Sequence, residues 1–283
     1  MSVGVIQGRL ESYRCNSTLE EDRAIREITQ EIVLAALART DFFRKAAFQG
    51  GTCLRILHGL NRFSEDLDFA LMTPDRSFRL EPYVPDIRRE MAAYGYDIEF
   101  IDRSKAEQPV QKAFLKDDSI GDLLQLNYRP RTGPMRAIRI KVEVDINPPV
   151  GADVESRYLD FPFPQAIAAF DPRSLFAGKL HAILCRGYLK GRDWYDFVWY
   201  TARKTSVNFK LLEAAIDQNG PWKGQGVTVD RTWCLEQLVR KIDSIDWDAA
   251  KEDIRPFVKS HEQPSIDLWS REFFMHQSGK VPE

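Results

Sequence analysis

Two aspartates in one short apolar run have the clearest chemical potential in this sequence. Asp66 and Asp68 flank Leu67, and the apolar run FAL follows them. In a β-strand, residues i and i+2 point to the same face, so both carboxylates are expected to project together. Two adjacent negative charges are unfavourable without a positive partner. The usual partner is a divalent cation that also binds nucleotide phosphates, because Mg²⁺ is held by one or two carboxylates plus substrate oxygens.

A glycine turn precedes this pair. Gly50-Gly51-Thr52 opens a short helix predicted over 52–60, and backbone N–H groups at a helix start bind phosphate well. Gly-Gly turns and Asp-x-Asp patterns are each common, and a purely structural role explains either one alone. Their order, a glycine turn, a helix and then a carboxylate strand, indicates nucleotidyl transfer. In that chemistry the turn binds a triphosphate and the carboxylates hold two metal ions.

A third carboxylate is expected from residues 138–146, IRIKVEVDI, whose strict alternation predicts a strand. Its charged face is explained equally well by simple exposure to solvent. Beside Asp66 and Asp68, however, Asp145 or Glu143 would complete a set of three metal ligands and supply a possible base. The choice between the two stays open at this stage.

The elements that position these residues follow from periodicity and turn signals. Apolar spacing predicts a helix from Leu19 to about residues 39–41, capped by Ser17 or Thr18. Residues 1–15 are expected to be irregular, and 42–48 to form a short strand or to lead into one. Further predictions are a helix over 84–94, strands over 96–102 and 123–128, and helices over 171–189, 193–204, 209–218, 233–242 and 248–258, with a last one after 265. Because 148–164 is rich in proline and aromatic residues, an α+β domain is predicted over 1–160 and a helical domain over 161–283.

Composition narrows the function classes. The 283 residues carry a formal net charge of -2, so nothing in the overall charge requires nucleic acid. The four cysteines and four histidines are scattered, which argues against a zinc site and favours a reducing, cytoplasmic compartment. No apolar run approaches the length of about 18 residues that spans a membrane. A local basic stretch would face a phosphate backbone or, equally well, only solvent: Arg129, Arg131, Arg136, Arg139 and Lys141.

Residues 49–69, QGGTCLRILHGLNRFSEDLDF, resemble the signature of the AbiEii/AbiGii toxin family of nucleotidyltransferase-like proteins. The matching positions are Gly50, Gly51, Thr52, Arg55, Arg62, Ser64, Asp66, Asp68 and Phe69. Residues 175–200, LFAGKLHAILCRGYLKGRDWYDFVWY, resemble the second motif of that family, a lysine helix followed by Arg-Asp-x-x-Asp. Those positions are Lys179, Arg186, Arg192, Asp193 and Asp196.

The resemblance implies a toxin of a type IV toxin–antitoxin or abortive-infection system, neutralised by a separately encoded antitoxin. It implies a nucleotidyltransferase-like domain with a mixed sheet and flanking helices, and a helical domain that contributes Lys179 and Asp196 to the cleft. The implied reaction moves a nucleoside monophosphate from an NTP to an acceptor hydroxyl with Mg²⁺ or Mn²⁺, and RNA, above all a tRNA 3′ end, is the leading acceptor. The alternatives are a small-molecule or protein hydroxyl as acceptor, or nucleotide binding without transfer.

The site residues expected from the residue patterns and from this resemblance form three overlapping groups. Asp66, Asp68 and Asp145 are expected to ligate the metal, and together with Lys179 and Asp196 they form the expected catalytic set. The expected nucleotide-binding residues are Gly50, Gly51, Thr52, Arg55, Arg62, Ser64, Lys179 and Asp193.

Each of the charged and polar residues in these groups has a structural alternative. Lys179 suits phosphate as a compact cation, or is a solvated helix lysine. Asp193 and Asp196, spaced i, i+3, serve catalysis or form salt bridges with Lys179 or Arg186. The arginine forks suit carboxylates as well as phosphates, and Ser64 suits a turn as well as a phosphate.

Overall fold

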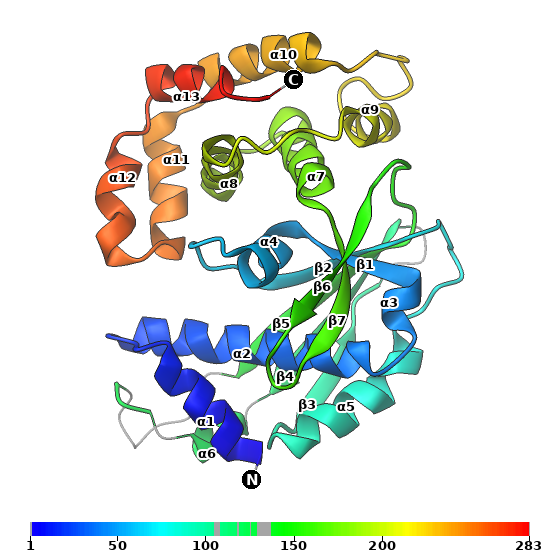
Figure 1. Ribbon diagram of the computed structural model, residues 1–283, viewed down its shortest axis with the longest axis vertical. Coiled ribbons are helices and arrows are strands. Elements are labelled where there is room, and N and C mark those ends of the chain that lie inside the picture. Colours follow the sequence, from blue (N-terminus) through cyan, green and yellow to red (C-terminus); the bar gives the residue numbers. More distant parts are fainter. Residues whose placement is uncertain (1, 105–107, 118, 125, 129–136, 283) are drawn as a thin grey trace. The chain divides into compact units, whose positions relative to one another are not determined.

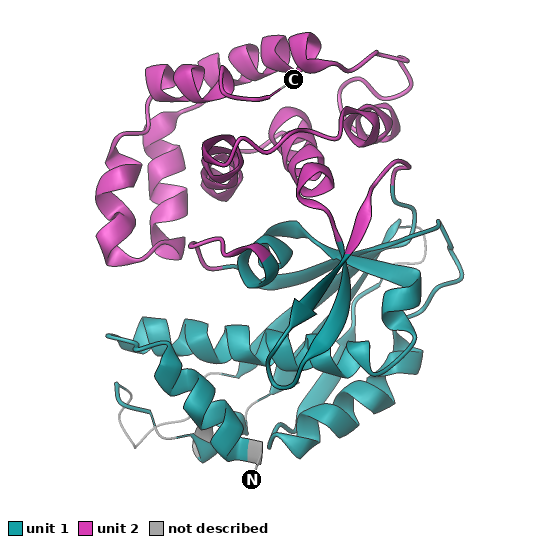
Figure 2. Ribbon diagram, viewed as in Figure 1, with its two compact units in different colours: residues 1–57, 64–148, 156–169 teal, residues 58–63, 149–155, 170–283 magenta. Residues whose placement is uncertain are grey.

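The computed structural model describes residues 2–104, 108–117, 119–124, 126–128 and 137–282. The chain forms two compact units whose segments alternate along the sequence (Figure 2). Unit 1 comprises residues 1–57, 64–148 and 156–169, and unit 2 comprises 58–63, 149–155 and 170–283. The domain boundary expected at residue 160 stays a prediction.

A mixed β-sheet forms the framework of unit 1 (Figure 1). Seven strands make up this sheet within the described residues, in the order β3-β4-β5-β2-β1-β7-β6. Their bounds are β1 Ala46–Gln49, β2 Asp66–Leu71, β3 Ile98–Asp102, β4 Val110–Asp117, β5 Ile138–Asp145, β6 Val154–Leu159 and β7 Gln165–Phe170. Strand β2 pairs antiparallel with β1 and parallel with β5, so the strand with both aspartates lies between two hydrogen-bonded neighbours.

The longest helix of unit 1 packs along this sheet. Helix α2, Thr18–Ala38, begins after Ser17, whose side chain accepts a hydrogen bond from the Glu20 N–H. It buries Ile25, Ile28 and Ile32 completely, and each such side chain contributes about 1.5–3 kcal/mol relative to exposure. The other helices here are α1 Ser2–Ser12, α3 Phe42–Lys45, α4 Gly50–His58, α5 Val84–Ala93 and α6 Ile120–Leu123, with a 3₁₀ turn over Glu81–Tyr83.

Unit 2 is mainly helical and has an aromatic core. Its helices are α7 Pro172–Cys185, α8 Gly191–Ala202, α9 Phe209–Gln218, α10 Arg231–Asp243, α11 Trp247–Ile254, α12 Gln263–Asp267 and α13 Arg271–Ser278, with 3₁₀ turns over Arg255–Phe257 and Ser260–Glu262. Phe176 stacks on Tyr200 with ring centroids 4.4 Å apart, and Trp247 stacks on Phe274 at 4.2 Å. No helix among the described residues is both long and apolar enough to span a membrane.

The α+β class predicted from the sequence is confirmed, but three local predictions are wrong. Residues 2–12 form a helix because Ile6 and Leu10 share one face and become buried there. The strand predicted over 123–128 is absent from the described part of that segment, where α6 ends at Leu123. For residues 42–48, the alternative of a short strand over the whole segment is wrong. The segment is first helical, in α3, and leads into β1, which begins at Ala46.

Candidate functional site

The glycine turn lies directly against one of the two strand aspartates. Gly50 follows β1 with a φ of +78°, in the left-handed region that favours glycine. A Cβ at this position would lie only 2.5 Å from Oδ2 of Asp68. The cause is the antiparallel register, which pairs Gln49 with Asp68. The start of α4 and the carboxylate of Asp68 therefore occupy neighbouring positions that only glycine permits.

Two hydroxyl groups tie α4 to the beginning of β2. The Thr52 side chain is fully buried and donates a hydrogen bond to the backbone carbonyl of Asp66. Its Oγ1 also lies 2.9 Å from Oγ of Ser64. Both hydroxyls of the motif thus fix the backbone around the first aspartate.

The neighbouring strand supplies the candidate third carboxylate. Because β2 and β5 are parallel, Asp66 lies beside Lys141, Asp68 beside Glu143, and Ala70 beside Asp145. Glu143 is therefore level with the aspartate pair, and Asp145 lies two residues farther along the same face. The register favours Glu143 over Asp145 as the third ligand, and both assignments stay predictions.

Two lysines balance the charge of Glu143. Nζ of Lys141 lies 2.7 Å from Oε2 of Glu143 and 3.4 Å from Oδ2 of Asp66, while Nζ of Lys112 lies 3.0 Å from Oε1 of Glu143. Burial raises the pKa of the Glu143 carboxyl, but hydrogen bonds from the two lysines outweigh burial and hold that pKa below its ordinary value. Burial raises the pKa of Asp145, which accepts a hydrogen bond from the Asn147 N–H.

These residues fit a hard divalent cation that is shared with a phosphate. Within the described residues, no three His, Cys, Asp or Glu side chains gather closely enough to bind a metal ion by themselves. Mg²⁺, however, needs only one or two carboxylates when phosphate oxygens and water complete its shell. Asp66 and Asp68 offer oxygen donors only, on one strand face. Because Gly50 has no Cβ, the glycine turn approaches the carboxylate of Asp68 closely.

The arginine of the first motif that lies on α4 has an internal partner. Arg55 forms an ion pair with Glu27 on α2. Sequence reasoning expected Arg55 to bind a carboxylate or a phosphate but did not identify Glu27. No periodic signal marks that glutamate, because α2 buries polar residues beside its apolar stripe.

In unit 2, charged residues of the second motif form a network of ion pairs with Arg62 of the first motif. The guanidinium of Arg62 grips Asp196 with two parallel hydrogen bonds of 2.6 Å. Nζ of Lys179 lies 2.8 Å from Asp196 and 2.8 Å from Asp193, which also pairs with Arg186. Among the partners that the sequence offers for these aspartates, the observed ones are Lys179 and Arg186. Arg62 was expected to bind a carboxylate or a phosphate, and its partner Asp196 was not identified.

This network of ion pairs is largely buried, and the protonation state of its members depends on their neighbours. The side chain of Asp196 is fully buried, and those of Asp193 and Arg62 are nearly so. Burial raises the pKa of Asp196, but the charges of Arg62 and Lys179 outweigh burial and lower it below the ordinary value. Burial lowers the pKa of Lys179, and the charges of Asp193 and Asp196 outweigh that effect and raise it. Asp196 therefore stays ionised and paired near neutral pH.

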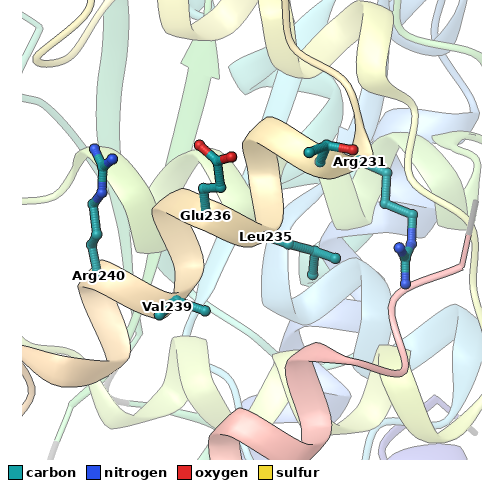
Figure 3. A pocket seen from close by; sticks show the side chains of 6 residues that line it. Arg231, Leu235, Glu236, Val239 and Arg240 are labelled. Atoms are coloured by element: carbon teal, nitrogen blue, oxygen red, sulfur yellow. The ribbon is translucent and has the colours of Figure 1, made fainter.

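A surface hollow on unit 2 contains none of the expected site residues. It has a volume of about 510 Å³, lies along one side of α10 and is lined by Arg231, Thr232, Leu235, Glu236, Val239 and Arg240 (Figure 3).

Of the predicted basic stretch, Arg129, Arg131 and Arg136 lie outside the described residues, and Lys141 belongs to the carboxylate cluster of β5.

Comparison with known proteins gives a family and a fold. The family model described as "Nucleotidyl transferase AbiEii toxin, Type IV TA system" matches residues 32–272. No curated protein sequence matches significantly. The structure is similar to JHP933 from Helicobacter pylori, with a TM-score of 0.53 and 14% identity over 91% of this chain and 88% of that one. It is also similar to MenT4, a nucleotidyltransferase toxin from Mycobacterium tuberculosis H37Rv, with a TM-score of 0.51 and 15% identity over 100% of both chains. At these identities the two likenesses show the fold alone.

The contact between Gly50 and Asp68 predicts the effect of adding one methyl group. Gly50→Ala is expected to displace the Asp68 carboxylate and to weaken Mn²⁺ binding, measured by electron paramagnetic resonance, by about 10-fold or more. Gly59→Ala is the matched control, because Gly59 also has a positive φ, of +74°, but nothing lies within 4 Å of its added Cβ. Both variants carry the backbone strain, so equal Mn²⁺ affinities in the two would contradict the prediction.

The buried network of ion pairs around Asp196 predicts a large loss of stability from one substitution. Asp196→Asn leaves Arg62 and Lys179 facing a neutral group, and the free energy of unfolding in urea is expected to fall by about 3–5 kcal/mol. The stabilisation from the lowered pKa is present above about pH 3.9, the ordinary value for Asp, and is lost as pH falls through the folded-state pKa.

The control for this substitution is Asp248→Asn, which removes an exposed ion pair with Lys251 and is expected to cost less than about 1 kcal/mol. A loss of similar size in both variants would show that the Asp196 pair contributes nothing special.

Proposed function

The chain belongs to the nucleotidyl transferase AbiEii toxin family of type IV toxin–antitoxin systems, and from that premise we propose that it transfers a nucleoside monophosphate to RNA. The membership makes it a nucleotidyltransferase toxin, with an NTP as substrate and an antitoxin as partner. The finer proposal is that the acceptor is a hydroxyl at the 3′ end of tRNA. We further propose that it acts in the cytoplasm, where NTPs and tRNA are abundant.

One observation supports this proposal most directly: the start of α4 and the carboxylate of Asp68 are neighbours. A helix start carries partial positive charge and unpaired N–H groups, which suit the phosphates of an NTP. The aspartates suit the cation that accompanies those phosphates. Both halves of the proposed metal–triphosphate site would therefore come from consecutive elements of one unit.

The proposed chemistry is an in-line substitution at phosphorus. The acceptor hydroxyl forms a bond to the α-phosphorus, the bond from that phosphorus to the bridging oxygen breaks, and pyrophosphate leaves. Bound Mg²⁺ or Mn²⁺ would supply charge neutralisation for the phosphates and activation of the hydroxyl. Asp66 and Asp68 would hold that ion with Glu143 or Asp145, and the latter pair would provide the carboxylate that accepts the hydroxyl proton.

The remaining motif residues would orient the nucleotide. Gly50 and Gly51 would present backbone N–H groups to phosphate, with Thr52 and Ser64 keeping the turn in place. We propose that Lys179 binds phosphate, since an ammonium has three N–H donors and its two observed partners leave capacity for a third. Arg62, Asp193 and Asp196 would keep Lys179 in place through their ion pairs. Arg55 would hold α4 through its ion pair with Glu27.

Labelling with nucleotide separates this proposal from its rivals. With [α-³²P]NTP, the wild-type protein is expected to label added tRNA in the presence of Mg²⁺. Asp66→Asn is expected to reduce the rate by about 10³-fold, since losing a metal ligand costs several kcal/mol of transition-state stabilisation. Asp102→Asn, at the exposed end of β3, is the matched control and is expected to retain wild-type labelling. In cells, only the Asp66 variant should lose the growth arrest.

Label that appears only on protein or on a small molecule would overturn the RNA acceptor. Full labelling by Asp66→Asn would overturn the catalytic assignment itself.

A further inference from the structure

A buried glutamine on α2 contacts the backbone that leads into the first aspartate. Gln30 is fully buried, although its side chain is polar. Its Nε2 donates to two consecutive backbone carbonyls, at 3.3 Å to Ser64 and 2.8 Å to Glu65. These are the two residues directly before Asp66, so the amide holds the segment from which β2 begins.

The other end of this amide has a cost. Within the part of the chain that the structure describes, Oε1 of Gln30 is buried and has no hydrogen-bond partner. A buried acceptor without a partner is destabilising, and most buried polar atoms in folded proteins have a partner. A methionine of similar length would remove the cost of Oε1 in the same space. The contacts of the NH₂ group explain why an amide stands here.

Other side chains hold the same segment from different directions. Thr52 on α4 donates to the carbonyl of Asp66, and Nη1 of Arg26 on α2 lies 3.1 Å from the carboxylate of Glu65. Three consecutive carbonyls, those of residues 64, 65 and 66, are therefore fixed by two side chains. The direction of a strand side chain follows from its backbone, so this clamp sets where the Asp66 carboxylate points.

We propose that Gln30 is a positioning residue for the Asp66 carboxylate, acting through the Ser64 and Glu65 carbonyls. The inference rests on the proposed metal-binding role of Asp66. It assigns α2 a part in the reaction site although none of the helix belongs to the motifs. Groups that orient metal ligands typically change metal affinity or activity by 10–100-fold when they are removed.

The test compares two buried substitutions on the same helix. Gln30→Met keeps the length of the side chain but removes both donors. Thr29→Val removes a hydroxyl that is equally buried and that bonds the Ile25 carbonyl and the Tyr96 hydroxyl instead. Mn²⁺ affinity is measured by electron paramagnetic resonance, and backbone mobility by amide hydrogen exchange over residues 64–67. Gln30→Met is expected to weaken Mn²⁺ binding about 10-fold and to speed exchange over 64–67, with Thr29→Val close to wild type in both.

The outcomes are distinct. Unchanged exchange and affinity in Gln30→Met, or the same losses in Thr29→Val, would overturn the positioning role. If the wild-type protein itself binds no Mn²⁺, the proposed metal chemistry fails, while the exchange measurement still decides what Gln30 holds. Should Gln30→Met not fold, Gln30→Asn replaces it. Its amide is one methylene too short to reach the two carbonyls, and unchanged exchange in that variant would equally reject the proposal.

Discussion

The close approach of Gly50 to Asp68 is the constraint on which the site in unit 1 depends. It places the positive start of α4 beside a carboxylate, and that arrangement is favourable by itself, since acids near a helix start are typically stabilised by about 0.3–1 kcal/mol. A triphosphate at the same helix start would bring further negative charge to the same place. A cation between the carboxylate and the phosphates would offset the repulsion between them. The placement of Asp68 at the start of α4 and the proposed metal dependence therefore have the same electrostatic explanation.

The charges of the two aspartates Asp66 and Asp196 are neutralised in different ways. Asp66 is 38% exposed, and among the described residues its carboxylate has one long ion-pair contact, to Lys141, so its oxygens keep room for an external cation. Asp196 is fully buried, and both of its oxygens accept hydrogen bonds or ion pairs from Arg62 and Lys179. The first arrangement suits ligand binding, whereas the second suits holding side chains in place. For Asp196, the observed contacts therefore add a positioning task to the catalytic role proposed from its motif.

Local sequence signals predicted the aspartate strand well and its neighbours less well. The bounds of β2 match the prediction because apolar and acidic residues alternate there and a turn precedes them. Strand register is not encoded locally, so the position of Glu143 beside Asp68 required the structure. The Arg62–Asp196 pair joins residues 134 positions apart, and Gln30 contacts residues 34 and 35 positions away; no spacing rule anticipates either. Helix α1 was missed because a few buried residues in a polar segment give a weak periodic signal.

The short spacing of Arg62, Ser64 and Asp66 has a physical explanation in these contacts. Arg62 and Phe63 belong to unit 2, where the first grips Asp196 and the second donates its N–H to the Phe257 carbonyl at 2.8 Å. Ser64 and the residues after it belong to unit 1, where Thr52 and Gln30 hold their backbone. The chain thus passes from one unit to the other in a single peptide step, and each motif residue on either side has its own anchor. Arg62 and Ser64, the two motif residues with these contacts, lie within four residues of Asp66. Because so few backbone torsions separate them from Asp66, a substitution that frees either one is expected to change the position of its carboxylate. In the proposed reaction site, the arginine and the serine of the motif would therefore act by fixing the backbone before Asp66.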